Sequence, residues 1–508
     1  MRKAWKHLFA LAAAFVVAVA TLGVRALAED PTYKITIQNA EAGHTYEAYQ
    51  IFAGTYSGGV LSDITWGTGI ADTATLEAKY GTASALAEKL TATDNTKVDA
   101  KVLAAYLSTT KGILSTDTNN VKSFTWNAAD KTYTASGLPA GYYLVKDKDN
   151  SLDTSTGTSY TDFIMQVVGN VTVEAKGSAP TVTKTVLSGT TYQKYLDTAI
   201  GSTVTFKLEA TLPTKYDNFS TYALSFVDTH DPGLTYSANT ASITAQLVHA
   251  GADTGTTIAN TAYTTTYSDT ERKLTIAFSN LKADVADAKF GDHIIVTYNM
   301  TLNENAVIGG NGNPNTVKLD YSNNPTKKDS TGSTPEDKAI VFTYGVRIAK
   351  VDQDRKALTG ATFTLESIDA DGNYKTVGDA TVSDNLHTWK GLAPGTYRLT
   401  ETAAPAQYNK LAKSMEFTIT ASHTPGTNGS VDHVVGGSEV SIDGTTTEFE
   451  SVTEGTSTYL GLTVQNKKGS TLPSTGGMGT TLFYGIGGLL VVAGGALFIA
   501  KKNAGKIN

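Results

Sequence analysis

An amine, a carboxylic acid and a carboxamide stand in three separate segments of the C-terminal third of this chain. Lys350 lies within a segment of strict apolar alternation, Glu401 within a second, and Asn466 follows the last one. An amine attacks an amide only when it is unprotonated, and burial lowers the pKa of a lysine while raising that of a carboxylic acid. A neutral Glu401 that contacts the Asn466 carboxamide would then shuttle the proton from Lys350. The alternative is a solvated Lys350–Glu401 pair with Asn466 in a turn.

The segment that contains Glu401 reads YRLTETAAPAQY. It resembles the E-box of sortase-assembled pilins (Y-x-L-x-E-x-x-A-P-x-G-Y), with Gln407 where Gly is usual. Residues 346–466 as a whole resemble the collagen-adhesin B-type domain of these pilins. The resemblance implies an intramolecular isopeptide bond between Lys350 and Asn466, formed with loss of ammonia and with Glu401 as the catalytic acid.

The middle of the chain offers a parallel set, with Lys184 near its beginning. Its closing segment LDYSN, residues 319–323, has the same length as the segment LTVQN at 462–466 and ends in Asn at the same distance from its first residue. This match favours Asn323 over Asn324 as the amide. The segment FVDTHDPGLTY resembles the one that supplies a catalytic Asp in the middle domain of such pilins, which implies Asp228. Asp231 is the competing candidate, although Asp-Pro-Gly is typical of a plain turn.

The first region repeats part of the third without its acid. GLPAGYYLV at 137–145 parallels GLAPGTYRLT at 391–400, which indicates duplication of one sandwich type. We align Lys146 with Glu401, so the proton relay lacks an acid and we expect no bond there. Asp147 follows Lys146 and should point to the other face of the strand.

The C-terminal end has a specific order of parts. The motif Leu472-Pro473-Ser-Thr475-Gly476 precedes the uncharged span 482–500, which is long enough to cross a bilayer as a helix. Lysines follow this span and would stay on the cytoplasmic side. The order resembles the cell-wall sorting signal of Gram-positive surface proteins, which implies cleavage by sortase between Thr and Gly. An ordinary tail-anchored protein with a chance turn is the alternative.

The same resemblance implies a lysine to which sortase joins the cleaved Thr of another subunit. VTVEAK, which ends at Lys176, matches the pilin motif V-x-V-Y-P-K at both valines and at the lysine, with Glu174 and Ala175 in place of Tyr and Pro. Lys176 also lies where the last strand of the first domain ends. Lys184 is the rival, although its place at a strand start suits the internal bond better, and an ordinary surface lysine is the remaining alternative.

Strands separated by turn formers predict a mostly β chain of tandem immunoglobulin-like β-sandwich domains. Apolar residues at helical spacing between Leu76 and Tyr106 predict a helical insertion in the first domain. The expected parts are a signal peptide at 1–28, an N-terminal pilin domain at 29–177, a middle domain at 178–330, an E-box domain at 340–468 and a sorting signal at 472–508.

Composition and the first residues indicate an exported protein. Arg2, Lys3 and Lys6 precede an apolar stretch and an Ala-Leu-Ala site ending at residue 28, as in a secretory signal peptide. The chain contains no cysteine, so no disulfide can brace its extracellular domains. The net charge of −7 argues against nucleic acid as a partner.

We therefore expect the structural backbone subunit of a covalent pilus (fimbria), anchored to the peptidoglycan of a Gram-positive bacterium and supporting adhesion. The expected partners are sortase, neighbouring copies of this pilin, peptidoglycan, accessory pilins and host surface ligands, with neither cofactor nor metal. The alternative is a wall-anchored adhesin or accessory pilin that binds host matrix or glycans. An enzyme is disfavoured, because Glu401 and Asp228 would each act once on their own chain, and His230 beside Asp228 reads as part of a turn.

Overall fold

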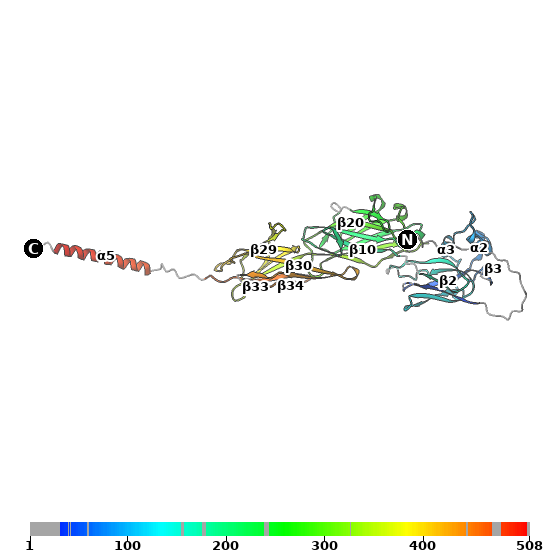
Figure 1. Cartoon of the computed structure of the whole chain (residues 1–508), viewed down its shortest axis with the longest axis horizontal. Helices are drawn as coiled ribbons and strands as arrows, with labels where there is room; N and C mark the ends of the chain where they lie inside the picture. The colour runs from blue at the N-terminus through cyan, green and yellow to red at the C-terminus, as the bar shows by residue number, and fades with distance from the viewer. Residues whose placement is uncertain are drawn as a thin grey trace, which may run out of the picture.

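The computed structural model describes residues 31–38, 40, 42–57, 60–153, 157–174, 179–237, 243–325, 327–442, 445–469 and 479–504. Figure 1 shows three β-rich domains in a row and a separate C-terminal helix. The prediction of a mostly β chain of tandem sandwiches with a helical insertion is confirmed. The predicted signal peptide, Lys176 and the motif Leu472 to Gly476 lie outside the described residues.

The first domain packs two sheets face to face and adds helices to one of them. The sheets run β5-β6-β1-β9 and β3-β2-β7-β8, with β4 beside β2. The helices begin where Asp72, Thr82 and Asp99 accept hydrogen bonds from backbone N–H groups of the first turn. The elements are β1 (Tyr33–Gln38), β2 (Tyr46–Ser57), β3 (Val60–Trp66), α1 (Thr73–Tyr80), α2 (Ala83–Thr91), α3 (Ala100–Thr109), β4 (Val121–Ser123), β5 (Thr125–Asn127), β6 (Thr132–Leu138), β7 (Gly141–Asp147), β8 (Asp162–Val167) and β9 (Val171–Glu174).

The second domain is a sandwich of two larger sheets, β11-β10-β13-β20-β16-β17 with β15, and β12-β23-β21-β14-β19-β18 with β22. Its long strands bury every second residue, as expected when one face of each sheet meets the other sheet. The elements are β10 (Thr181–Ser188), β11 (Thr191–Gln193), β12 (Tyr195–Asp197), β13 (Thr203–Thr211), β14 (Leu224–His230), β15 (Leu234–Thr235), β16 (Thr244–Val248), β17 (Thr256–Ile258), β18 (Thr264–Ser268), β19 (Lys273–Phe278), α4 (Leu281–Asp284), β20 (His293–Leu302), β21 (Asn313–Ser322), β22 (Thr331–Ser333) and β23 (Asp337–Phe342), with short 3-10 turns at Tyr216–Asn218 and Asn260–Ala262.

The second domain extends beyond residue 330, its predicted end. β22 and β23 both pair with β21, so these strands belong to one of its two sheets. Only Thr343 separates β23 from the first strand of the third domain, and this threonine is fully buried. The two domains are therefore joined by nearly continuous strand.

The third domain pairs its first and last strands side by side. Its sheets run β27-β28-β24-β35-β34 and β26-β25-β29-β30-β31, with a separate β32-β33 hairpin, and β24 and β35 are parallel neighbours. The elements are β24 (Tyr344–Val351), β25 (Thr362–Ile368), β26 (Tyr374–Gly378), β27 (Thr381–Ser383), β28 (Leu386–Leu392), β29 (Gly395–Ala403), β30 (Met415–Pro425), a 3-10 turn (Thr427–Gly429), β31 (Val431–Gly437), β32 (Val440–Ile442), β33 (Thr445–Thr447), β34 (Glu450–Glu454) and β35 (Ser457–Gln465).

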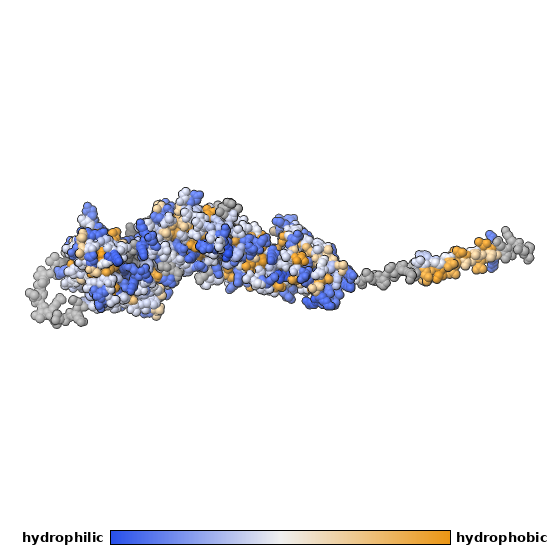
Figure 2. All heavy atoms as spheres, turned by 180° about the vertical axis from the view of Figure 1, so that it is seen from behind, coloured by the Kyte–Doolittle hydropathy of each residue, from blue (hydrophilic) through white to orange (hydrophobic). Residues whose placement is uncertain are grey.

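The helix α5 (Gly479–Ala504) stands apart from the three domains and includes the predicted span 482–500. Its segment Thr481–Lys502 has a mean hydropathy of 2.1 and is long and apolar enough to cross a membrane. Figure 2 shows apolar residues over this helix. The side chains of Phe483 and Leu489, which belong to it, are largely exposed. Lys501 and Lys502 lie in its last turn.

Candidate functional site: two buried lysine–acid–amide clusters

The third domain brings Lys350, Glu401 and Asn466 together in its core. Lys350 takes an inward position on β24, in phase with Val346 and Ile348, where an apolar side chain would be expected. Glu401 comes from β29 in the facing sheet, and Asn466 directly follows β35, the parallel neighbour of β24. All three residues are at most 2% exposed. The alternative of a solvated ion pair is therefore wrong.

Hydrogen bonds in this cluster link the amine to the amide and the amide to the acid. Lys350 Nζ donates to Asn466 Oδ1 and, at 3.1 Å, to the carbonyl of Val464. Asn466 Nδ2 donates to Glu401 Oε1 at 2.8 Å, and the same oxygen lies 3.8 Å from Lys350 Nζ. The second oxygen, Oε2, accepts the N–H of Leu411 at 2.7 Å. One carboxyl oxygen thus lies within reach of both the lysine amine and the amide nitrogen.

The second domain buries Lys184 and Asp228 against each other across the sandwich. Lys184 lies on β10 in one sheet and Asp228 on β14 in the other, and both are fully buried. Lys184 Nζ donates to Asp228 Oδ2 and to the hydroxyl of Tyr298 at 2.7 Å. Asp231, the competing acid, instead accepts the N–H of Gly233 in a turn.

Asn323 is not part of this cluster, so the expectation that it approaches Lys184 is wrong. Asp228 lies opposite Val317 on β21, whereas Asn323 lies beyond the far end of that strand, past Tyr321. The Asn323 Oδ1 atom accepts the hydroxyl of Ser330 at 2.7 Å. The reason is topological: in the third domain the amide follows β35, which lies beside the strand of the lysine, whereas in the second domain β21 belongs to the sheet opposite the lysine.

The amide that the structure does place here is Asn315, which the sequence analysis missed. Asn315 is fully buried on β21, and its Nδ2 donates to the Tyr298 hydroxyl at 3.0 Å. The apolar alternation of this segment could have indicated it, because Asn315 is in phase with the inward residues Val317, Leu319 and Tyr321. A polar residue at a core position of a strand is unusual enough to be noticed.

Burial sets the protonation of the second cluster. It lowers the pKa of Lys184 from 10.5 to about 8, although the charge of Asp228 opposes this shift. Burial also raises the pKa of Tyr298 well above its ordinary value, so this hydroxyl keeps its proton. An appreciable fraction of Lys184 is therefore an uncharged, nucleophilic amine at neutral to mildly alkaline pH.

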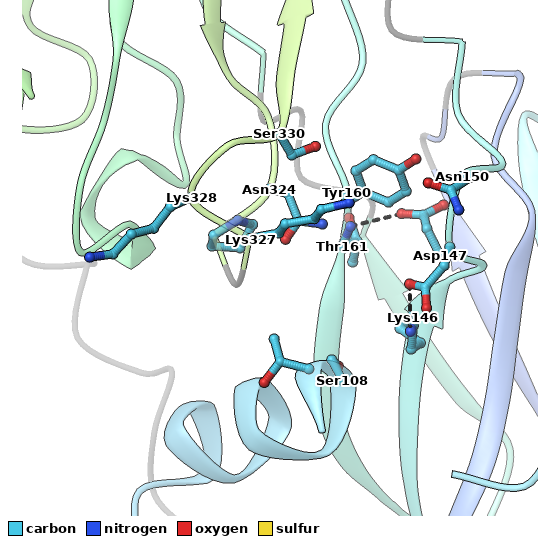
Figure 3. Close-up of a pocket in the computed structure, with 13 residues that line it drawn as sticks. Ser108, Lys146, Asp147, Asn150, Tyr160, Thr161, Asn324, Lys327, Lys328 and Ser330 are labelled. Carbon is cyan, nitrogen blue, oxygen red and sulfur yellow. Dashed lines mark hydrogen bonds and ion pairs between the residues drawn. The ribbon is translucent and has the colours of Figure 1, made fainter. Parts of the chain in front are cut away.

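In the first domain the position of Glu401 is held by Asp147, not by Lys146. Tyr143 and Tyr397 each donate to the carbonyl four residues earlier, which aligns the two strands and makes Asp147 the counterpart of Glu401. The expectation that Asp147 points away from the core is wrong: its side chain is fully buried, because β7 is covered on both faces. Figure 3 shows it linked to the N–H of Thr161, at 2.8 Å.

No amine faces this acid from the first strand of the domain in its described part. The inward residues of β1 are Ile35 and Ile37, and Asp147 instead contacts His44 Nδ1 at 2.8 Å. Lys146 pairs with Asp149 at the edge of the cavity drawn in Figure 3. The expectation of no bond in this domain stays a prediction, now for want of the amine.

The E-box loop also holds the chain where it leaves the third domain. The N–H of Asn409 donates to the carbonyl of Lys467 at 3.0 Å, and the N–H of Gly469 donates to the carbonyl of Gln407 at 2.8 Å. Gln407 adopts φ = 72°, in the left-handed region, which accounts for the preference for Gly at this position. The sorting motif therefore begins three residues after a fixed point.

Comparison with known proteins identifies related domains in this chain. Three family models match: the Gram-positive pilin backbone subunit 2, Cna-B-like domain at 200–325, the prealbumin-like fold domain at 345–431, and the LPXTG cell wall anchor motif at 464–506. The trypsin-resistant surface T6 protein of Streptococcus pyogenes serotype M6 is 25% identical over 97% of this chain and 99% of its own.

One solved structure similar to this chain supports the three-domain fold described above. The T6 backbone pilin of Streptococcus pyogenes, described as a modular three-domain structure, has a TM-score of 0.52 and 21% identity over 88% of this chain and 95% of its own. The full-length major pilin SpaD from Corynebacterium diphtheriae is more distant, with a TM-score of 0.47 and 17% identity over 87% and 98%.

The fold and the C-terminal motif define a wall-anchored surface protein of a Gram-positive bacterium. Within that class the chain is a backbone pilin, a structural subunit of a surface pilus with an LPXTG anchor. Its relatives are structural pilins rather than enzymes, and the anchor motif and pilin domains indicate sortase processing and polymerisation.

Proposed function

We propose that this backbone pilin is braced by two internal Lys–Asn isopeptide bonds, Lys350–Asn466 in the third domain and Lys184–Asn315 in the second. The observation that carries the proposal is the buried contact of Lys350 with the amide of Asn466, whose nitrogen contacts Glu401. Burying three polar side chains in an apolar core costs folding free energy unless they form hydrogen bonds with one another. A bond that removes the charge of the amine and releases ammonia explains their burial.

The third-domain reaction balances with the groups present. The lone pair of Lys350 Nζ attacks Cγ of Asn466, and the bond from Cγ to Nδ2 breaks. Glu401 Oε1 takes one proton from Nζ and delivers one to Nδ2, which departs as ammonia, so the acid is regenerated. Fixed geometry replaces an intermolecular encounter and supplies much of the rate. The acid acts once, so no enzyme turnover is implied.

The second-domain bond uses Asp228 in place of Glu401 and crosses the sandwich instead of joining neighbouring strands. Lys184 and Asn315 both contact one hydroxyl oxygen, that of Tyr298. Asp228 Oδ1 and Asn315 Oδ1 are buried without a donor among the described residues, a costly state for a resting cluster.

We further propose that sortase cleaves Thr475–Gly476 and joins Thr475 to Lys176 of another copy of this pilin. Support comes from position: β9 ends at Glu174, two residues before Lys176, and the E-box loop fixes the chain up to Gly469. Sortase and peptidoglycan are the required partners. Accessory pilins and host surface ligands would join through the assembled pilus.

Intact-mass measurement of the full chain tests the internal bonds. The proposal expects a deficit of two ammonia molecules, one of which returns in Glu401→Gln and the other in Asp228→Asn. The full mass in the wild-type protein would overturn it.

For polymerisation, Lys176→Ala should abolish the detergent-resistant ladder of wall extracts while wall-attached monomer remains. The exposed Lys328→Ala is the control, and a ladder that persists in Lys176→Ala would refute the assignment.

A further inference from the structure

The hydroxyl of Tyr298 lies at the centre of the second-domain cluster and contacts all three of its other members. It accepts from Lys184 Nζ at 2.7 Å and from Asn315 Nδ2 at 3.0 Å, and it donates to Asp228 Oδ2 at 2.8 Å. Tyr298 comes from β20, in the sheet that also holds Lys184. One oxygen therefore contacts both the attacking and the departing nitrogen of the proposed bond.

The third domain shows why a hydroxyl is useful here. There, a single glutamate oxygen contacts the departing nitrogen of Asn466 directly, at 2.8 Å. Aspartate is one methylene shorter than glutamate, and the contacts of Asp228 Oδ2 are with Lys184 and Tyr298. Tyr298 occupies the place between the acid and the amide nitrogen that the longer side chain fills in the other domain.

Packing fixes the position and the protonation of this hydroxyl. Tyr298 is 1% exposed, and its ring stacks on Phe206 with centroids 5.8 Å apart. The ammonium of Lys184 lies 4.8 Å from the centroid of the Phe206 ring, so both partners rest on the same aromatic side chain. Because the hydroxyl keeps its proton, it is a donor to the acid in the resting state.

We propose that Tyr298 is a catalytic residue that relays the proton from Asp228 to the departing nitrogen of Asn315. This inference rests on the proposed Lys184–Asn315 bond. As Lys184 Nζ bonds to Cγ of Asn315, one Nζ proton moves to Asp228 Oδ2. The Tyr298 hydroxyl gives its own proton to Nδ2 and takes the proton from Asp228. The Cγ–Nδ2 bond breaks, ammonia departs, and Tyr298 and Asp228 return to their initial states.

The test follows bond formation in newly made full-length chain. After an isotope pulse, digestion and mass spectrometry of the branched and linear peptides at successive times report the loss of ammonia from each domain. Tyr298→Phe keeps the ring and should slow the second-domain loss by about 100-fold or more, the usual contribution of general acid–base catalysis. The Lys350–Asn466 bond in the same molecule should form at the wild-type rate, which controls for export and folding.

Tyr222→Phe is the matched control, because it removes a buried hydroxyl of the same core that has no hydrogen-bond partner among the described residues. It should leave both rates unchanged. Fluorotyrosine at position 298 separates relay from positioning, since it keeps the hydrogen bonds but lowers the hydroxyl pKa. A relay predicts that its rate changes and varies differently with pH, whereas a merely structural hydroxyl predicts the wild-type profile.

Each outcome of these experiments supports or overturns the proposal. Slow loss of the second ammonia in Tyr298→Phe, together with an altered pH profile of the fluorotyrosine protein, supports the relay. A Tyr298→Phe that loses its second ammonia as fast as the wild-type protein overturns the relay and leaves the bond in place. An unaltered fluorotyrosine profile overturns it as well. A wild-type chain that never loses the second ammonia overturns the Lys184–Asn315 bond and the relay together.

Discussion

Replacing Glu401 by glutamine should remove the brace of the third domain while leaving its shape. The introduced glutamine would be isosteric with the acid and would still hydrogen-bond to Asn466, but it cannot take a proton from Lys350. The amine and the amide then stay separate in the core, and the domain loses the covalent link between its first and last strands.

The magnitude follows from the loop that the bond closes. Lys350 and Asn466 are 116 positions apart. By analogy with a disulfide, closing a loop of this length stabilises the domain by about 5 kcal/mol through the unfolded state. A domain of this size has an unfolding entropy of about 0.25 kcal/mol/K, so its melting temperature should fall by about 20 °C.

Calorimetry of the full chain provides the assay, with intact mass to confirm that one ammonia has returned. The third-domain transition should move down by itself, and trypsin should cut that domain first. Glu416→Gln, at an exposed position on β30 of the same domain, is the control and should not change either observable. A variant that regains the mass of one ammonia yet has the wild-type melting temperature would refute the bracing argument.

Three further predictions concern the other features. In Asn315→Ala, Lys184 stays a free amine whose pKa is lowered to about 8 in the folded state. The unfolded state then binds more protons than the folded state between about pH 8 and pH 10.5, so the melting temperature of this variant should rise across that range. Thermal scans of the wild-type protein, in which Lys184 is bonded, should show no such rise. Pulling single molecules by the two ends should release, from the second and third domains, at most the 34 residues 316–349 between the bonds, about 12 nm, whereas a bond at Asn323 would leave about 9 nm. The first domain, which we expect to hold no bond, should unfold as a separate step. Gln407→Gly should relieve a left-handed non-glycine residue and raise stability by about 1 kcal/mol in denaturant titrations, and a loss would show that the side chain matters more than φ.

Much of the third domain could be predicted because its chemistry lies next to motifs. Alternation placed Lys350 on an inward strand position, and the E-box placed Glu401. The amide follows the last strand, so its place could be inferred from the end of the apolar pattern. Local sequence sufficed because the first and last strands are neighbours in one sheet.

The second domain resisted the same argument because its lysine and its amide lie on strands of opposite sheets. Transfer of the offset from Asn466 to Asn323 assumed in-sheet pairing, which β10 and β21 do not have. Only the register of β14 against β21 shows that Asn315, and not Asn323, lies near Asp228. Register between distant strands depends on side-chain packing over the whole sheet, which sequence periodicity alone does not give.

The helical insertion illustrates the same point. Val98, Val102 and Tyr106 recur at helical spacing and α3 forms there, but this spacing does not identify its buried face. Val102 is 60% exposed, whereas Leu103 and Leu107 are at most 1% exposed. An amphipathic pattern with apolar residues on adjacent positions fits two faces, and the sheet beneath the helix decides between them.

Sequencing of cross-linked peptides by mass spectrometry tests the central claim most directly. Digestion of the full chain should yield two branched peptides, one that joins Lys350 to Asn466 and one that joins Lys184 to Asn315, each lighter by one ammonia than its two linear parts. Linear peptides that carry free Lys184 and intact Asn315, or a branch from Lys184 to Asn323, would contradict the account.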